Sequence, residues 1–113
     1  MNYDLEERTA KFGEEIIKFV QAIPRNDINR SLINQLVRSA TSIGANYMEA
    51  NQASSNKDFK NKIKISQKEA NETKHWLRML AMAEKSKIEE CRSLWQEAHE
   101  LVLIFAAISK KCK

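Results

Sequence analysis

The sequence contains very little glycine and proline: its 113 residues include only 2 glycines and 1 proline. Both residue types mark turns and interrupt helices, so their scarcity favours a few long helices joined by short connections. Charged residues make up 30% of the chain and hydrophobic residues 42%. Because a chain of this length can bury one core, the composition predicts a single all-α domain spanning residues 1–113.

Cysteine and long apolar runs are also scarce. The two cysteines, Cys91 and Cys112, lack the spacing of a metal or redox motif and are too few for a disulfide scaffold. The longest apolar run, residues 101–108, is far shorter than the ~20 residues of a membrane-spanning helix. Residues 1–8 are acidic and have no apolar segment, so we expect no signal or transit peptide and a cytoplasmic protein.

Apolar residues recur with helical spacing in four segments. Pro24 ends the first segment, a polar stretch around Ser55 separates the second from the third, and residues 85–87 form a turn before the fourth. Ser55 and Asp58 resemble a capping box, although Asp replaces the usual Glu or Gln. We predict helices at about residues 4–22, 28–51, 56–84 and 88–110, packed as an antiparallel up-and-down four-helix bundle.

The second and third helices each have a second face outside the expected core. On the second helix this face combines small side chains with a cation and an anion. The small side chains would let a neighbouring subunit approach closely, and the two charges would fix its register. On the third helix it mixes apolar groups with carboxylates, where Glu69 or Glu72 is expected to meet Arg38 and Trp76 to anchor a partner. We predict a homo-oligomer interface, termed the assembly face, formed by Arg38, Thr41, Ser42, Ala45, Glu49, Ile65, Glu69, Glu72 and Trp76. The alternative is an ordinary solvated surface with one stray tryptophan.

Two stretches carry a family resemblance: "QLVRSATSIGANYMEA" at residues 35–50 and "KDFKNKIKISQKEANETKHWLRML" at residues 57–80. They closely resemble the small bacterial four helix bundle proteins, also called 23S rRNA intervening-sequence proteins. The matching positions are Arg38, Ser39, Ala40, Ser42, Ile43, Ala45, Asn46, Glu49, Phe59, Glu69, Ala70, Glu72 and Leu77. The resemblance covers about residues 12–108 and implies antiparallel bundles that assemble as ring-shaped homopentamers, often encoded within an insertion in the large ribosomal RNA gene. A related branch, the accessory protein of diversity-generating retroelements, binds reverse transcriptase and nucleic acid.

Positive charge is concentrated in residues 54–87, which hold 9 Lys and Arg against 4 Asp and Glu, a surplus of 5. Six cationic or titratable groups lie on the side of the third helix opposite its core stripe and are termed the basic face: Lys57, Lys60, Lys64, Lys68, His75 and Arg78. Such an arc predicts salt-sensitive, sequence-independent binding of RNA or DNA. The alternative is a charged surface that only confers solubility. No aromatic residue is interleaved with these lysines, so the pattern does not predict base stacking.

Catalytic and metal motifs are weak. Arg92 and His99 share a helix face and resemble the Arg and His pair of HEPN ribonucleases, which is the alternative to a binding function. Glu72 and His75 match one half of a di-iron motif, but no second copy exists. We therefore expect a non-enzymatic binding or scaffold protein without a metal or cofactor. Its expected partners are further copies of itself, and nucleic acid or a nucleic-acid enzyme is the candidate further partner.

Overall fold

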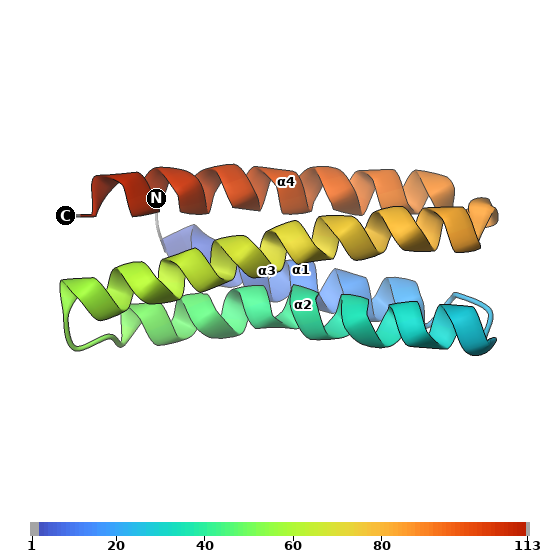
Figure 1. Cartoon of the computed structure of the whole chain (residues 1–113), viewed down its shortest axis with the longest axis horizontal. Coiled ribbons are helices and arrows are strands. Elements are labelled where there is room, and N and C mark those ends of the chain that lie inside the picture. The colour runs from blue at the N-terminus through green and yellow to red at the C-terminus, as the bar shows by residue number, and fades with distance from the viewer. Residues whose placement is uncertain (1–2, 113) are drawn as a thin grey trace.

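The computed structural model describes residues 3–112, with the side chains of residues 5–112, and this part of the chain is helical without strands. Figure 1 shows successive helices running in opposite directions, with α2, α3 and α4 side by side and α1 behind them. A short 3₁₀ turn, Lys85–Lys87, joins the last two helices. The bounds are Tyr3–Val20 for α1, Asp27–Asn51 for α2, Asn56–Ala83 for α3 and Ile88–Lys111 for α4. The predicted all-α class is confirmed.

Local capping explains where the helices begin. The side chain of Asn26 accepts a hydrogen bond of 2.8 Å from the backbone N–H of Asn29 at the start of α2. Ser55 accepts one of 3.0 Å from the N–H of Asp58 at the start of α3, as the capping pattern predicts. α1 ends at Val20, earlier than the predicted residue 22, because the N–H groups of Ala22 and Ile23 bond carbonyls three residues back and form a tighter turn before Pro24.

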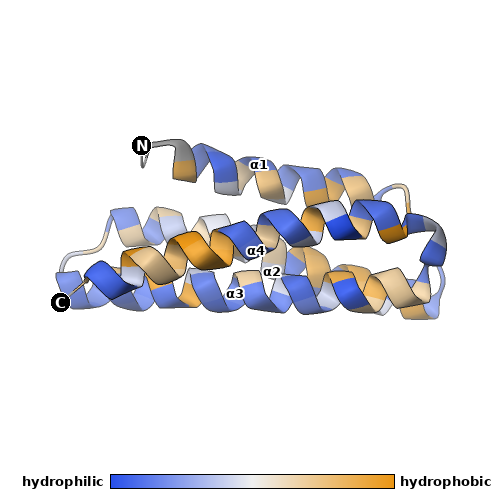
Figure 2. Cartoon of the chain, turned by 90° about the horizontal axis from the view of Figure 1, so that it is seen from above, coloured by the Kyte–Doolittle hydropathy of each residue, from blue (hydrophilic) through white to orange (hydrophobic). Residues whose placement is uncertain are grey.

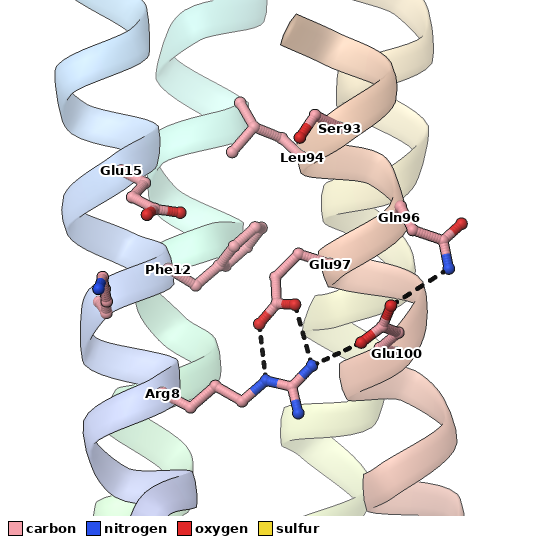
Figure 3. A pocket seen from close by; sticks show the side chains of 9 residues that line it. Arg8, Phe12, Glu15, Ser93, Leu94, Gln96, Glu97 and Glu100 are labelled. Atoms are coloured by element: carbon pink, nitrogen blue, oxygen red, sulfur yellow. Dashed lines mark hydrogen bonds and ion pairs between the residues drawn. The ribbon is translucent and has the colours of Figure 1, made fainter.

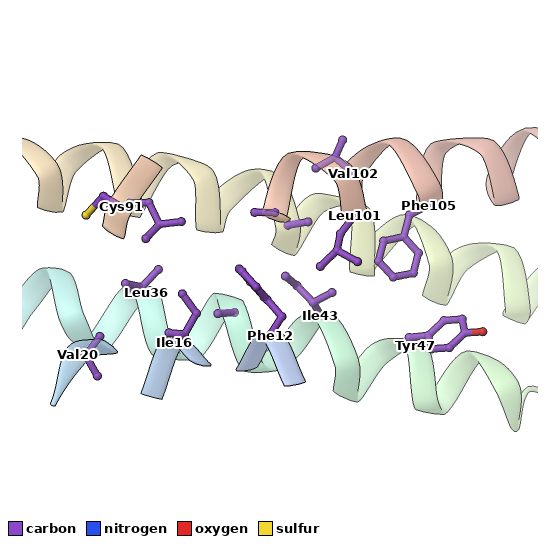
Figure 4. Close-up of a cluster of buried hydrophobic side chains, with 14 of the residues drawn as sticks. Phe12, Ile16, Val20, Leu36, Ile43, Tyr47, Cys91, Leu101, Val102 and Phe105 are labelled. Atoms are coloured by element: carbon purple, nitrogen blue, oxygen red, sulfur yellow. The ribbon is translucent and has the colours of Figure 1, made fainter. Parts of the chain in front are cut away.

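The core runs along the bundle and is filled by aromatic and branched side chains from the four helices, several of which are drawn in Figure 4. Phe12 of α1 is 1% exposed, and Leu36, Ile63 and Phe105 are fully buried. The ring centroids of Tyr47 and Phe105 lie 5.8 Å apart with a tilt of 55°. Burial of this apolar surface, at roughly 25 cal/mol per Å², is the main source of stability.

One apolar segment of α4 is only partly buried in this core. Figure 2 shows it in orange near the C-terminal end of the helix. Leu103 is 56% exposed, as expected from the width of the apolar arc, whereas Ile104 packs partly against the core. None of the described helices is long and apolar enough to cross a membrane.

Candidate nucleic-acid interface

The basic face lies along the solvent side of α3. Five of its side chains are exposed and Lys60 is half-buried. None of the six forms an ion pair with another described residue. At 1.5 Å per residue, the positions from Lys57 to Arg78 cover about 30 Å of helix. The arrangement therefore presents a row of unpaired cations that is long enough to follow several phosphates of a nucleic-acid strand.

Other lysines of α3 are held by neighbouring helices instead. The Lys62 ammonium lies 2.8 Å from a carboxylate oxygen of Glu49, and this charge and hydrogen bond raise the pKa of Lys62. The Lys74 ammonium donates to Nδ1 of His99, 3.0 Å away. These two lysines point toward α2 and α4, which separates them from the unpaired cations of the basic face.

Two acidic residues of α3, Glu69 and Glu72, are held toward α2 by Arg38. Its guanidinium lies 3.3 Å from Glu69 Oε1 and also donates to Glu72 Oε1 (both on α3). Partial desolvation lowers the pKa of Arg38, but the charges and hydrogen bonds of Glu69 and Glu72 raise it by more. The predicted contact of Arg38 with Glu69 or Glu72 therefore forms with both, within one chain.

The assembly face is open in this chain. Arg38, Thr41, Ala45 and Glu49 are exposed, and Ser42 is half-buried. The Ser42 hydroxyl donates to the Arg38 carbonyl at 2.7 Å and the Thr41 hydroxyl to a carbonyl of its own helix. With the hydroxyls and both charges satisfied internally, the face offers mainly small apolar groups to a neighbour.

Trp76 differs most from its expected position among the assembly-face residues. It packs partly against the core, and its indole N–H is buried without a hydrogen-bond partner. His75 lies edge-on to its ring, with centroids 4.9 Å apart. A helical wheel places Trp76 outside the core stripe of α3, but the ring still packs against the edge of the core. Ile65, at 37% exposed, is the more accessible large apolar group on this face.

Arg92 and His99 have separate partners. The Arg92 guanidinium lies 3.5 Å from the Glu89 carboxylate, and its side chain is 70% exposed. The His99 ring stacks on Trp95, with centroids 5.1 Å apart and an interplanar angle of 15°. Since lysine only donates, Nδ1 of His99 accepts the bond from Lys74. The structure thus places His99 against α3 rather than beside Arg92.

A cavity of about 530 Å³ lies between α1 and α4, and Figure 3 shows the ion pairs that cross it. Arg8 donates through Nε and Nη2 to Glu97, at 2.7 and 2.9 Å, and through Nη2 to Glu100 at 2.8 Å. The hydrogen bonds and charges of these carboxylates raise the pKa of Arg8 despite its partial burial. The sequence gives no local signal for this contact, because residues 8 and 97 are 89 positions apart.

Metal chemistry has no clear location in the described residues. No group of three or more His, Cys, Asp or Glu side chains there is arranged to hold an ion. Glu72 is engaged with Arg38, and His75 lies against Trp76. The single Glu and His spacing in the sequence therefore does not form part of a larger ligand cluster among these residues.

Comparison with known proteins identifies the family. A family model described as 23S rRNA-intervening sequence protein matches residues 1–107. A crystal structure from Bacteroides thetaiotaomicron VPI-5482, described as a protein with unknown function from the S23 ribosomal protein family, is similar with a TM-score of 0.85 and 34% identity, covering 94% of this chain and 98% of that chain. No curated protein matches. The chain therefore belongs to the 23S rRNA-intervening sequence protein family, as the sequence of its second and third helices predicts.

Proposed function

We propose that this protein is a cytoplasmic, non-enzymatic scaffold that assembles as a ring-shaped homopentamer and binds nucleic acid, or an enzyme acting on nucleic acid, through the basic face of α3. The observation that carries the proposal is the row of cations without carboxylate partners among the described residues. Arg38 supports it by directing Glu69 and Glu72 toward α2. Glu69 and Glu72 therefore compete less with phosphates for the lysines of this face, and the remaining nearby carboxylate, Asp58, forms no ion pair with them among the described residues.

Binding of this kind is driven by release of the counterions that surround a nucleic acid. Each neutralised phosphate contributes a slope of about −0.9 to the dependence of log affinity on log salt concentration for duplex DNA. A single chain offers only a few such contacts, so its affinity would be weak. In a ring the face is repeated, and simultaneous contacts raise the overall affinity through high effective concentration.

Fluorescence anisotropy with mixed-sequence RNA and DNA at low and moderate salt tests this function. We expect binding that weakens steeply with salt, and a smaller salt slope in Lys64→Gln and Lys68→Gln, by about 1 for each phosphate that the variant no longer neutralises. Lys62→Gln is the matched control, because Lys62 is already paired with Glu49. Absence of salt-dependent binding by the wild-type protein would contradict the proposal and leave an assembly whose charges only confer solubility.

Assembly is tested separately by light scattering. We expect a mass several times the 13.1 kDa of one chain, five times for the pentamer. Apolar surface on the assembly face and the exposed Leu103 side chain support association. A monomeric protein at micromolar concentration would contradict the ring, and nucleic-acid binding would then have to arise from one basic face alone.

The non-enzymatic assignment has its own test. The engagement of His99 with Lys74 and Trp95 supports a structural role for this histidine. Incubation of the wild-type protein and His99→Ala with labelled single-stranded RNA should show no cleavage by either. Cleavage by the wild-type protein that disappears in both His99→Ala and Arg92→Ala would instead favour a HEPN-like ribonuclease.

A further inference from the structure

A second cavity, of about 410 Å³, opens between α3 and α4 at the end of the basic face. Its walls are mainly apolar and include Leu77, Ala81, Ile88 and Trp95, with one arginine from each helix, Arg78 and Arg92. Its volume is within the range of roughly 300–1,000 Å³ that is typical of small-molecule sites. The cavity therefore combines an apolar interior with two guanidinium groups.

Both arginines are available to an anionic ligand. Arg78 is exposed and has no ion-pair partner among the described residues. Within the described part of the chain, Arg92 forms an ion pair with Glu89 alone, at 3.5 Å, and since both side chains are at least 70% exposed this pair is weak. Arg78 is also the last cation of the basic face, so phosphates that follow α3 would reach the mouth of this cavity.

Trp95 is fixed in position by two neighbours. The His99 ring stacks on it, and the Lys74 ammonium lies 4.6 Å from its ring centroid. The hydrogen bond between Lys74 and His99 links these two neighbours to each other. Because the indole is already ordered, a flat ligand that packs against it in the cavity would lose little further side-chain entropy.

We propose that the α3–α4 cavity binds one unpaired base of a single-stranded nucleic acid, with Trp95 as the packing surface and Arg78 and Arg92 as contacts to the adjoining phosphates. An aromatic ring next to guanidinium groups is the combination that recognises bases and backbone in single strands. A duplex keeps its bases stacked inside, so it would use the lysines alone. This inference rests on the proposed function of the basic face and adds a preference for single strands.

Anisotropy with a labelled 12-nucleotide RNA, the matching DNA and their duplexes tests the inference. We expect Trp95→Leu, which keeps an apolar side chain, to weaken binding of single strands roughly 10-fold and to leave duplex binding and its salt slope unchanged. Lys64→Gln should weaken both. Suppose that Lys64→Gln weakens binding of single strands and of duplexes, and that Trp95→Leu weakens neither or weakens the two equally: the cavity inference is then wrong and the basic-face function stands. If the wild-type protein binds no nucleic acid, the cavity inference and the basic-face function are both wrong.

A second measurement does not depend on replacing Trp95. In a Trp76→Phe variant, Trp95 is the only tryptophan, since the chain contains 2. We expect its fluorescence to be quenched by the single-stranded RNA and not by the duplex. Poly-glutamate is the comparison polyanion: equal quenching by poly-glutamate would overturn the base assignment in favour of an acidic peptide, and unchanged fluorescence with bound RNA would place the base elsewhere.

Discussion

The Thr73 hydroxyl of α3 lies 2.9 Å from the Ser39 hydroxyl of α2, and both residues are fully buried. Ser39 also donates to the carbonyl of Leu36 at 3.2 Å, so its oxygen is free to accept from Thr73. The bond joins the two longest helices at one position of the core. The Thr73 hydroxyl also lies 2.9 Å from the carbonyl of Glu69 in its own helix. A shift of α2 against α3 would therefore break the bond between the helices and leave each hydroxyl only a carbonyl of its own helix, so the pair favours the observed register.

Replacing Thr73 by Val keeps the shape of the side chain and removes the donor. We expect the free energy of unfolding to fall by about 1 kcal/mol, since the bond between the helices is lost while Ser39 keeps its bond to the Leu36 carbonyl. Urea denaturation measures the change. Thr41→Val is the control: the Thr41 hydroxyl is exposed and bonds only its own helix, so its loss should have little effect. Adding Ser39→Ala to Thr73→Val should cost less than the two single changes added together.

Most of the fold follows from local sequence signals. Pro24 and the cap at Ser55 determine helix ends through steric and hydrogen-bonding effects of a few residues, so the predicted bounds lie within two residues of the observed ones. The buried polar residues were only partly predicted. Ser66 and Thr73 lie at helical spacing from the buried Ala70, so their burial follows from periodicity. The bond between Thr73 and Ser39 does not, because it depends on the register of α2 against α3.

The candidate sites show the same limit. A helical wheel places Lys62 about 120° from the nearest lysine of the basic face, so helical geometry alone separates the two. Lys74 lies only about 40° from Arg78 on the same wheel, and its separation from the face depends on its bond to His99. The α3–α4 cavity was not predicted. Trp95 lies at helical spacing from the buried Cys91 and Ala98, which predicts a position near the core. Its place at the cavity wall depends also on Lys74 of α3, which no local pattern indicates.

The two glycines should respond differently to alanine. A Cβ on Gly13 would meet Thr41 Cγ2 at an ordinary 3.6 Å, whereas one on Gly44 would meet Thr9 Oγ1 at 3.1 Å. We expect Gly13→Ala to stabilise the protein by about 0.5–1 kcal/mol through higher helix propensity, and Gly44→Ala to lose that gain to crowding between α1 and α2. Thermal unfolding compares the two. Thr9→Ala should relieve the crowding in Gly44→Ala; equal stabilisation by both glycine changes would show that α1 shifts freely.

Arg38→Glu should lower the stability of the folded subunit and weaken its association into an oligomer. Three carboxylates would then meet between α2 and α3, and we expect a loss of about 1 kcal/mol that grows at low salt, with helix content largely retained. Circular dichroism and sedimentation measure the two effects. Adding Glu72→Arg restores an ion pair within the chain and should recover the stability. An oligomer mass unchanged in Arg38→Glu would show that the assembly face is not the subunit interface.

Because of Cys91, the free energy of unfolding is expected to fall at high pH. Burial, with a smaller effect of the Glu90 charge, raises the pKa of its thiol from an ordinary value near 9 to about 11. The folded chain therefore holds this proton more tightly than the unfolded chain. The associated stability is complete below pH 9 and is lost as the pH rises through about 11, a change of about 2 kcal/mol by pH 10.5.

Urea unfolding between pH 8 and 10.5 tests this dependence, and Cys91→Ala provides the comparison. The variant is expected to start less stable but to lose less stability over this range, because the titrating thiol is gone. Iodoacetamide should modify the half-buried Cys112 well before Cys91. Parallel pH profiles of the wild-type protein and the variant would contradict a raised pKa at Cys91.

Arg8 is expected to hold α1 against α4. The helix packs mainly on α2, and the bonds of Arg8 to Glu97 and Glu100 are the side-chain hydrogen bonds between α1 and α4 in the described part of the chain. Arg8→Gln should therefore speed amide hydrogen exchange in residues 5–15 several-fold while the middle of α2 and α3 stays protected, because opening of α1 requires less free energy once the ion pairs are gone. Lys11→Gln, which changes another cation lining the same cavity, should leave exchange unchanged. Faster exchange throughout all four helices in Arg8→Gln would mean that α1 opens only together with the rest of the bundle.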